Sequence, residues 1–364
     1  MLSPPFVPHA LDNAILLAVD VALLLALARR PGPRALAGAL LGAALATAGA
    51  AAGIAGVVPP DPQAGSIFLL FGLLAWGIFL HGPFLALAAA AILRRRRPHW
   101  AAASAGLGAL LLLLALWSIW IEPRWVEVSH HTIASPKLTS AVRVVVLADL
   151  QCARVGDYER SVLRRAAAEK PDLVLLPGDY LHTFTAERYR EEVPALHDAF
   201  AALPWNPVLG IFAVEGNVDR PGWPAIFAGL GVETMEKTRT VRRGEIALTG
   251  LSFADAADPH FELPAAGGFH IVLGHHPDFA LGTVPADLLV AGHTHGGQVR
   301  LPFWGPLLTL SRVPRTWAAG RTELGGGRTL VVSRGIGMER GHAPRVRFLC
   351  RPEIVVLDLV PAAP

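Results

Sequence analysis

Two histidines separated by a single residue follow an apolar stretch late in the sequence. The segment "DLLVAGHTHGGQ" places His293 and His295 after a run of Leu, Val and Ala, and two glycines follow. Alternate positions of an extended chain point to the same side, so the two imidazoles would face one way. A polar turn with glycines for the bend would explain the pattern. A metal site would also explain it, because imidazole is a common metal ligand, but it needs partners elsewhere in the chain.

Such partners follow four earlier apolar stretches. They are Asp149 in "VRVVVLAD", Asp179 in "PDLVLLPGD", Asn217 in "VLGIFAVEGN" and His275 in "FHIVLGHH". The carboxyl ends of parallel strands meet in one crevice, where ligands bind. A single Asp after a strand is usually a cap or turn residue. Five strand ends with such residues together predict a mixed carboxylate, amide and imidazole shell that suits two divalent ions.

The elements that must position these residues alternate between strands and helices. Further apolar stretches read "EIALTGLSF", "TLVVSRG" and "EIVVLDLV", and the segments "YERSVLRRAAAEK" and "AERYREEVPALHDAFAAL" have helical periodicity. Strands rich in Val, Leu and Ile that alternate with helices predict an α/β fold with sheets covered on both faces. We expect this domain over residues 141–364, after a linker over residues 122–140.

The ordered set "ADLQ", "PGDY", "EGNVD", "GHHPD" and "GHTHGGQ" resembles the calcineurin-like metallophosphoesterases, most of all their bacterial membrane-associated branch. The family pattern is D-x-H, G-D, G-N-H-[DE], H and G-H-x-H, and the resemblance covers roughly residues 122–360. It implies a two-sheet α/β/β/α sandwich with two divalent metal ions, which would be Mn, Fe or Zn. By position, the first ion would be held by Asp149, Asp179 and His295, and the second by Asp179, Asn217, His275 and His293.

This family resemblance implies a phosphoesterase, with Asp179, Asn217 and His293 as catalytic residues. Two ions about 3.5–4 Å apart would clamp phosphoryl oxygens and lower the pKa of a shared water, which makes hydroxide available near neutral pH. The expected substrate is a phosphorylated small molecule or a lipid-linked phosphate ester or pyrophosphate.

The sequence departs from the family pattern twice. Gln151 stands where the first motif has His, and Val218 stands where the third motif has the His that protonates the leaving group. Loss of a general acid typically costs about 10²–10⁴-fold in rate. An enzyme with a good leaving group, or with an acid from elsewhere, would explain the change; His276, His130 and His131 are candidates for that acid. The alternative is a catalytically degenerate, membrane-anchored module that binds or senses a phosphate ligand.

Another histidine could replace the ligand that is missing at Gln151. In "GDYLH", His182 lies three residues after Asp179. The related purple acid phosphatases also lack the first His and use a Tyr ligand at this offset. We therefore expect Gln151 and His182 to complete the first metal site, His182 by occupying the vacated position; an ordinary loop histidine is the alternative.

The first 121 residues contain four apolar stretches that are long enough to span a bilayer as helices. The chain is 52% hydrophobic and 17% charged, and its mean hydropathy is +0.43, which is too apolar for a soluble protein of this length. The four spans lie approximately at 10–28, 35–58, 67–93 and 101–121. Asp20 lies within the first, and we expect a hydrogen bond to a neighbouring helix rather than a proton relay.

Charge asymmetry predicts the orientation. The loop after the first span carries Arg29, Arg30 and Arg34, and the loop after the third carries residues 94–97, all Arg, whereas the N-terminal tail and the second loop carry neither Lys nor Arg. The positive-inside rule places these two loops in the cytoplasm. We therefore expect a multi-pass protein of the bacterial inner or plasma membrane, in contact with lipids, with its C-terminal domain on the periplasmic or extracellular side. The net charge of +3 gives no sign of a nucleic-acid partner.

Overall fold

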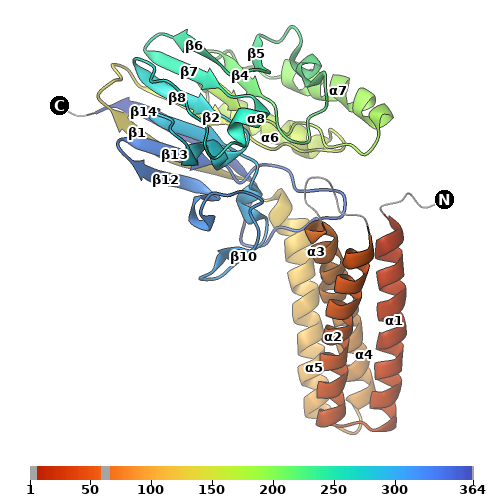
Figure 1. Ribbon diagram of the computed structural model, residues 1–364. Coiled ribbons are helices and arrows are strands. Elements are labelled where there is room, and N and C mark those ends of the chain that lie inside the picture. Colours follow the sequence, from red (N-terminus) through yellow and green to blue (C-terminus); the bar gives the residue numbers. More distant parts are fainter. Residues whose placement is uncertain (1–5, 59–65, 363–364) are drawn as a thin grey trace. The chain divides into compact units, whose positions relative to one another are not determined.

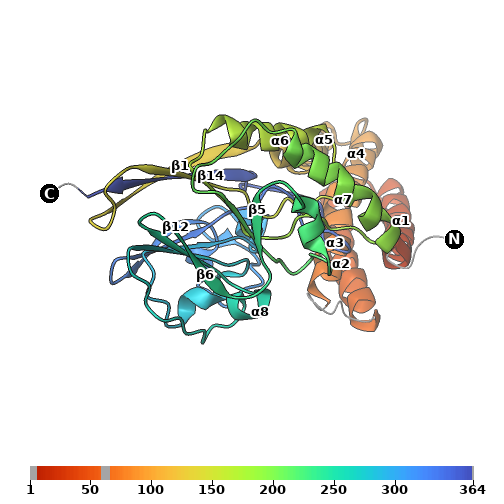
Figure 2. The ribbon, with the colours of Figure 1, turned by 90° about the horizontal axis from the view of Figure 1, so that it is seen from above.

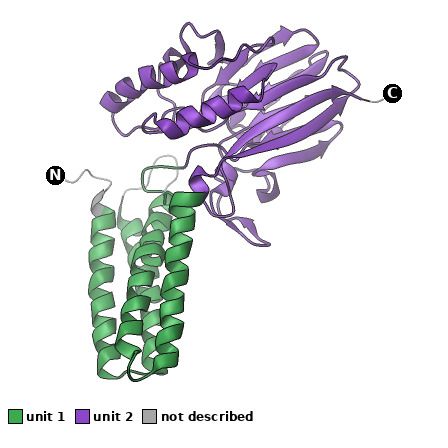
Figure 3. Ribbon diagram, turned by 180° about the vertical axis from the view of Figure 1, so that it is seen from behind, with its two compact units in different colours: residues 1–121, 339–345 green, residues 122–338, 346–364 purple. Residues whose placement is uncertain are grey.

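The computed structural model describes residues 6–58 and 66–362. It divides into two compact units (Figure 3), one of residues 1–121 with 339–345, the other of residues 122–338 with 346–364.

The first unit is helical. Its elements are α1 (Phe6–Arg29), α2 (Pro33–Val57), α3 (Ile67–Trp76), the π-helical η1 (Gly77–His81), α4 (Gly82–Leu93), α5 (Pro98–Leu116) and the π-helical η2 (Trp117–Ile121). Within the described residues, four helical segments are long and apolar enough to cross a membrane: 8–29, 33–57, 67–93 and 98–124. They match the four predicted spans and are labelled in Figure 1.

The polar residues inside these helices contact one another. His81 Nδ1 lies 2.8 Å from the Asp20 carboxylate, and His81 Nε2 lies 3.0 Å from Asn13 Oδ1. The expected hydrogen bond from Asp20 to a neighbouring helix is thus present, and its partner is the histidine of η1. Pro83 lies just after η1; a proline lacks the N–H that would donate to the preceding turn, which is a common cause of such π-helical turns.

The second unit contains two six-stranded sheets. The first has the order β1-β14-β2-β3-β4-β5 and the second the order β12-β13-β9-β8-β7-β6. The strands of the first sheet are β1 (Glu127–Ser135), β2 (Val142–Val146), β3 (Leu173–Leu176), β4 (Ile211–Val214), β5 (Val232–Met235) and β14 (Glu353–Pro361). Those of the second are β6 (Arg239–Arg243), β7 (Ile246–Gly250), β8 (Phe269–Leu273), β9 (Leu288–Ala291), β12 (Gly320–Gly325) and β13 (Arg328–Val332). A separate hairpin pairs β10 (Arg300–Leu301) with β11 (Gly305–Pro306).

The sheets pack face to face, with helices on both outer sides. Side chains from both inner faces, such as Val144, Leu175, Ile271 and Val290, form one continuous buried cluster. The helices α6 (Asp157–Ala168) and α7 (Ala186–Ala201) pack on the outer face of the first sheet, and the short α8 (Phe253–Ala256) packs on that of the second. Figure 2 shows these layers from above. The predicted α/β/β/α sandwich is confirmed.

The structure corrects the expected linker over residues 122–140. Residues 127–135 form β1, which pairs in parallel with β14 over nine residues. The linker was predicted because "EVSHHTIAS" lacks a continuous apolar run. An edge strand needs only one buried face, however, and in β1 the buried side chains are Ile133 and Ser135 at alternate positions.

Candidate metal centre

The predicted ligands lie at the carboxyl ends of five strands. Strands β2, β3 and β4 are parallel neighbours in one sheet, and β8 and β9 are parallel neighbours in the other. Each strand is followed within three residues by one predicted ligand: Asp149, Asp179, Asn217, His275 and His293. The two sheets therefore bring residues that are far apart in the sequence to one place.

Four ligand atoms converge on one point. His275 Nε2 lies 2.9 Å from Asn217 Oδ1, 3.3 Å from His293 Nδ1 and 3.5 Å from Asp179 Oδ2. His293 Nδ1 lies 3.0 Å from Asn217 Oδ1. These are the spacings of ligands around a single transition-metal ion, whose bonds are about 2.0–2.2 Å long. The set is the one that the family resemblance assigns to the second ion.

The protonation of the two imidazoles is set from outside the cluster. His275 Nδ1 donates a hydrogen bond to the Pro177 carbonyl at 2.7 Å, and His293 Nε2 donates one to the Leu310 carbonyl at 3.1 Å. Burial lowers the pKa of His275 to about 3 and holds the pKa of His293 well below its usual range, so both rings are neutral. Each ring therefore points a lone pair into the cluster, as a metal ligand does.

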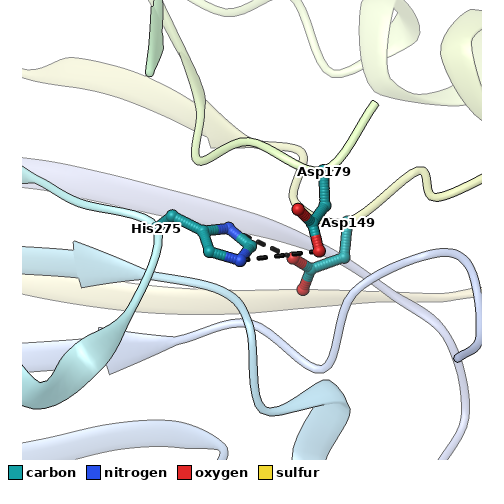
Figure 4. Close-up of side chains that lie close together, drawn as sticks. All are labelled: Asp149, Asp179 and His275. Carbon is teal, nitrogen blue, oxygen red and sulfur yellow. Dashed lines mark ion pairs between the residues drawn. The ribbon is translucent and has the colours of Figure 1, made fainter. Parts of the chain in front are cut away.

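Two of the first ion's predicted ligands, Asp149 and Asp179, are grouped beside this cluster. One atom each from Asp149, Asp179 and His275 lies within 4.8 Å of the other two (Figure 4). Both oxygens of Asp149 accept the backbone N–H of His293, at 3.0 and 3.1 Å. His295 is buried, and burial, followed by the charge of Arg347, holds its pKa well below its usual range. Two buried carboxylates so close together need a compensating positive charge, and a divalent ion would supply it.

The backbone at the centre is strained. Ten non-glycine residues of the described chain have positive φ, and five of them are predicted site residues: Asp149, Gln151, Asp179, His293 and His295. Such conformations cost about 1–3 kcal/mol each and gather at functional sites. Glycine is required beside them: a Cβ on Gly216 would lie 2.4 Å from the backbone nitrogen of Asp179. The strain is therefore tied to the close approach of the loops that carry the ligands.

Gln151 and His182 are also brought together. Gln151 Nε2 lies 3.3 Å from His182 Nδ1, and Gln151 is fully buried. The pairing that the exchange hypothesis requires is therefore present, while coordination by His182 stays a prediction.

Of the candidate general acids, His276 lies beside the cluster, with its ring centroid 4.0 Å from that of His293. His130 and His131 lie in β1.

Sequence reasoning missed two groups that hold the site together. The Asp219 carboxylate accepts the backbone N–H groups of Asp179, Tyr180 and Gly216, each at 2.8 Å, and so ties the loop after β3 to the loop after β4. The acidic residue that ends "GNVD" was the available signal. The other group is the Leu310 carbonyl, for which no sequence signal exists because any residue supplies one.

Two arginines of the C-terminal part of the chain, where a basic residue could contact a substrate phosphate, have structural roles instead. Arg347 is fully buried and donates to the carbonyls of Arg334, Gly335, Gly337 and Cys350. Arg334 pairs with Glu127 and Glu353. Two others, Arg312 and Arg315, line a cavity of about 580 Å³ that also borders His276. Arg312 and Arg315 are therefore placed to meet a substrate beside His276.

Comparison with known proteins agrees with this geometry. Residues 142–297 match the family model of the calcineurin-like phosphoesterases. The chain is 30% identical over 302 residues to the uncharacterised metallophosphoesterase YkuE of Bacillus subtilis, covering 77% of this chain and 96% of that one. It is 32% identical to the phosphodiesterase YaeI of Escherichia coli, covering 66% of this chain and 90% of that one. It is 22% identical to the UDP-2,3-diacylglucosamine pyrophosphatase LpxG of Chlamydia trachomatis, covering 68% of this chain and 93% of that one.

The matches include every strand end that carries a predicted ligand, and two of these relatives reach 30% identity or more while covering nine-tenths of their own length. The chain belongs to the calcineurin-like metallophosphoesterases, a family of metal-dependent phosphoric ester hydrolases.

Proposed function

We propose that this protein is a membrane-anchored phosphoesterase that uses two divalent ions, held by the residues named above, to hydrolyse a phosphodiester or pyrophosphate. The observation that carries the proposal is the convergence of Asn217, His275 and His293. In each of the two imidazoles the tautomer is fixed by a hydrogen bond to a backbone carbonyl outside the cluster. Bound ions would polarise the phosphoryl group and activate a water. A lipid-linked substrate is supported by the apolar helices and by the similarity to LpxG, a pyrophosphatase of UDP-2,3-diacylglucosamine.

The chain's own groups would position the ligands and exclude bulk water. Asp219 and the Val218 N–H, which donates to Asp179 Oδ1 at 2.9 Å, orient the shared carboxylate. Pro177 and Leu310 orient the two imidazoles. Val218 itself has no proton to give, so we propose a substrate whose leaving group departs without protonation, such as a pyrophosphate or an activated diester.

The direct test is hydrolysis by the full-length protein purified in detergent. With added Mn²⁺ it should cleave an aryl phosphodiester, and Asp179→Asn should abolish the activity. Asp157→Asn, on the exposed first turn of α6, is the matched control and should leave the rate unchanged. Metal binding without turnover of phosphomonoesters, diesters and pyrophosphates would instead favour the degenerate binding module that the loss of the family His at Val218 suggests.

The orientation is tested separately. We propose that unit two lies on the periplasmic or extracellular side, because the arginines gather in the loops after the first and third spans. A reporter that is active only in the periplasm, fused after residue 125, should be active. Activity of a cytoplasm-only reporter at the same position would reverse the orientation and exclude an exoplasmic substrate.

A further inference from the structure

The hairpin of β10 and β11 exposes apolar side chains that nothing in the described chain covers. Phe303 at its tip is 112% exposed and Trp304 is 65% exposed; Leu301 and Leu307 on either side are 42% and 41% exposed. Large aromatic side chains are usually packed in a core, and in the structure neither of these two is. Together Leu301, Phe303, Trp304 and Leu307 form what we call the hairpin patch.

The conformation of Phe303 breaks a local rule. Its φ is +64°, a left-handed value that hairpin turns normally assign to Gly, Asn or Asp. A fully exposed Phe in this conformation adds backbone strain and exposes a large apolar side chain, with no compensating contact inside the unit. Residues that break local rules in this way are expected where a partner is bound.

The hairpin is held rigidly in this exposed position. The Arg315 guanidinium donates to the Pro306 carbonyl and lies over the Trp304 ring, 5.0 Å from its centroid. On the other side, Pro306 packs against Gly297, where an added Cβ would lie 2.3 Å from Pro306 Cβ. The patch is therefore a fixed projection of the domain.

Charge around the hairpin patch favours an anionic partner. Residues 288–322 contain no Asp or Glu, and the patch is flanked by Arg300, Arg312 and Arg315. Aromatic tips with flanking arginines suit the interface of an anionic bilayer, where each basic residue contributes about 1 kcal/mol.

Hydrogen bonds also connect the base of the hairpin to the segment where the chain enters the domain. The backbone N–H of Cys350 donates to the Glu122 carboxylate, and the neighbouring Phe348 exchanges backbone hydrogen bonds with Gln298 and Arg300 at the base of β10. Glu122 belongs to the last candidate span, which covers residues 98–124. Trp125, directly after it, is 49% exposed and lies under Arg351. One edge of the domain thus carries both the exit from the span and the hairpin.

We propose that the hairpin patch inserts into the headgroup region of an anionic phospholipid bilayer, the same one that the four helices cross. The proposal requires that these helices span a membrane, but it does not require that the centre be active. Insertion of the patch would determine where the metal centre lies relative to the membrane. The loop after β11 supplies the Leu310 carbonyl that orients His293, so lipid contact at the patch would hold the metal centre close to the headgroups.

The test uses the full-length protein in vesicles of phosphatidylethanolamine and phosphatidylglycerol. Cys152 and Cys350 are both fully buried, so a fluorescent maleimide will react selectively with the exposed cysteine of Phe303→Cys. We expect lipids that carry a nitroxide on the upper acyl chain to quench most of the label's fluorescence, and aqueous iodide to quench it weakly. Removing phosphatidylglycerol should reduce the nitroxide quenching.

Val208→Cys is the matched control, because Val208 is an apolar residue that is 82% exposed in the turn before β4. Its label should be quenched by iodide and not by the nitroxide lipids. Strong iodide quenching at both positions, or equal nitroxide quenching at both, would overturn the proposal. Protection at position 303 that appears only at high protein density, without nitroxide quenching, would identify a second copy of the chain as the partner and would also overturn it.

Discussion

His275 Nε2 and His293 Nδ1 face each other at 3.3 Å, and each ring donates its only proton to a carbonyl on its far side. Two lone pairs directed at each other repel, and burial prevents either ring from taking up a second proton because it lowers the pKa of both. A cation between the two nitrogens removes the repulsion. This relationship, more than the presence of any single ligand, supports our interpretation of the crevice as a metal site.

Metal binding should release one proton at slightly acidic pH. Burial raises the pKa of Asp179 to about 7. Burial and the neighbouring Asp179 also raise the pKa of Asp219, but three backbone N–H donors oppose that rise, whereas only the Val218 N–H does so for Asp179; we therefore assign the proton to Asp179. A raised pKa means that Asp179 is mostly protonated below pH 7 without metal and must lose its proton to bind one. His275, with a pKa of about 3, contributes no proton in this range.

Affinity should therefore rise about tenfold per pH unit up to about pH 7 and then level off. Titration calorimetry with Mn²⁺ at pH 6, in buffers of different ionisation enthalpy, counts the protons directly. A proton count near zero at pH 6, with affinity that does not change with pH, would show that Asp179 is already ionised without metal.

The exchange between Gln151 and His182 is testable by rescue. With the Gln151 amide turned so that its oxygen accepts from His182 Nδ1–H, the Nε2 of His182 would carry the lone pair that binding of the first ion requires. We expect His182→Ala to lower the occupancy of one ion nearly as much as His295→Ala does. Adding Gln151→His to the His182→Ala variant should restore much of the lost occupancy. Unchanged metal content in His182→Ala would establish an ordinary loop histidine.

Restoring the family histidine should change the leaving-group preference. Val218 lies at the centre, since its N–H donates to Asp179 at 2.9 Å. Val218→His should raise the rate for alkyl phosphodiesters, which need a proton on the leaving oxygen, by about 10²-fold or more, with little effect on a nitrophenyl ester. The ratio of the two kcat/KM values is the measurement. Equal effects on both esters would mean that the new imidazole acts through structure rather than as an acid.

Arg347 should be important for stability rather than for substrate binding. Arg347→Met would remove the guanidinium that donates to the carbonyls of Arg334, Gly335, Gly337 and Cys350, and we expect a loss of about 3 kcal/mol in the free energy of unfolding. The apparent Tm in detergent should fall accordingly. Arg345→Met, two residues away and exposed, is the control. Equal melting temperatures for the two variants would contradict this role.

Much of this arrangement could be predicted from the sequence. Apart from Arg143 and His270, the residues of β2, β3, β4, β8 and β9 are apolar because these strands are buried on both faces, and each strand is followed within three residues by a predicted ligand. Strand identity and the order of motifs were therefore visible locally. The partner of Asp20 was harder to predict, because His81 lies 61 residues away and only the helix packing brings them together.

Other features left no local signal. β1 is recognisable only through its pairing with β14, and the carbonyls of Pro177 and Leu310 orient His275 and His293 through backbone atoms that every residue has. Arg347 resembles a surface cation in the sequence, and only its burial shows that it serves the loops around Asp149. Phe303 resembled a core residue because hydrophobicity alone does not distinguish a packed side chain from one that meets lipid.

The number of metal ions bound per chain tests the central claim most directly. Full-length protein reconstituted with Mn²⁺ and passed through a desalting column should retain about two ions by elemental analysis. Asp179→Asn should retain far fewer because it removes the shared ligand, and Asp157→Asn should match the wild type. Wild-type protein that retains no ion, or an Asp179→Asn variant that retains as many as the wild type, would contradict the assignment of this crevice as a dinuclear centre.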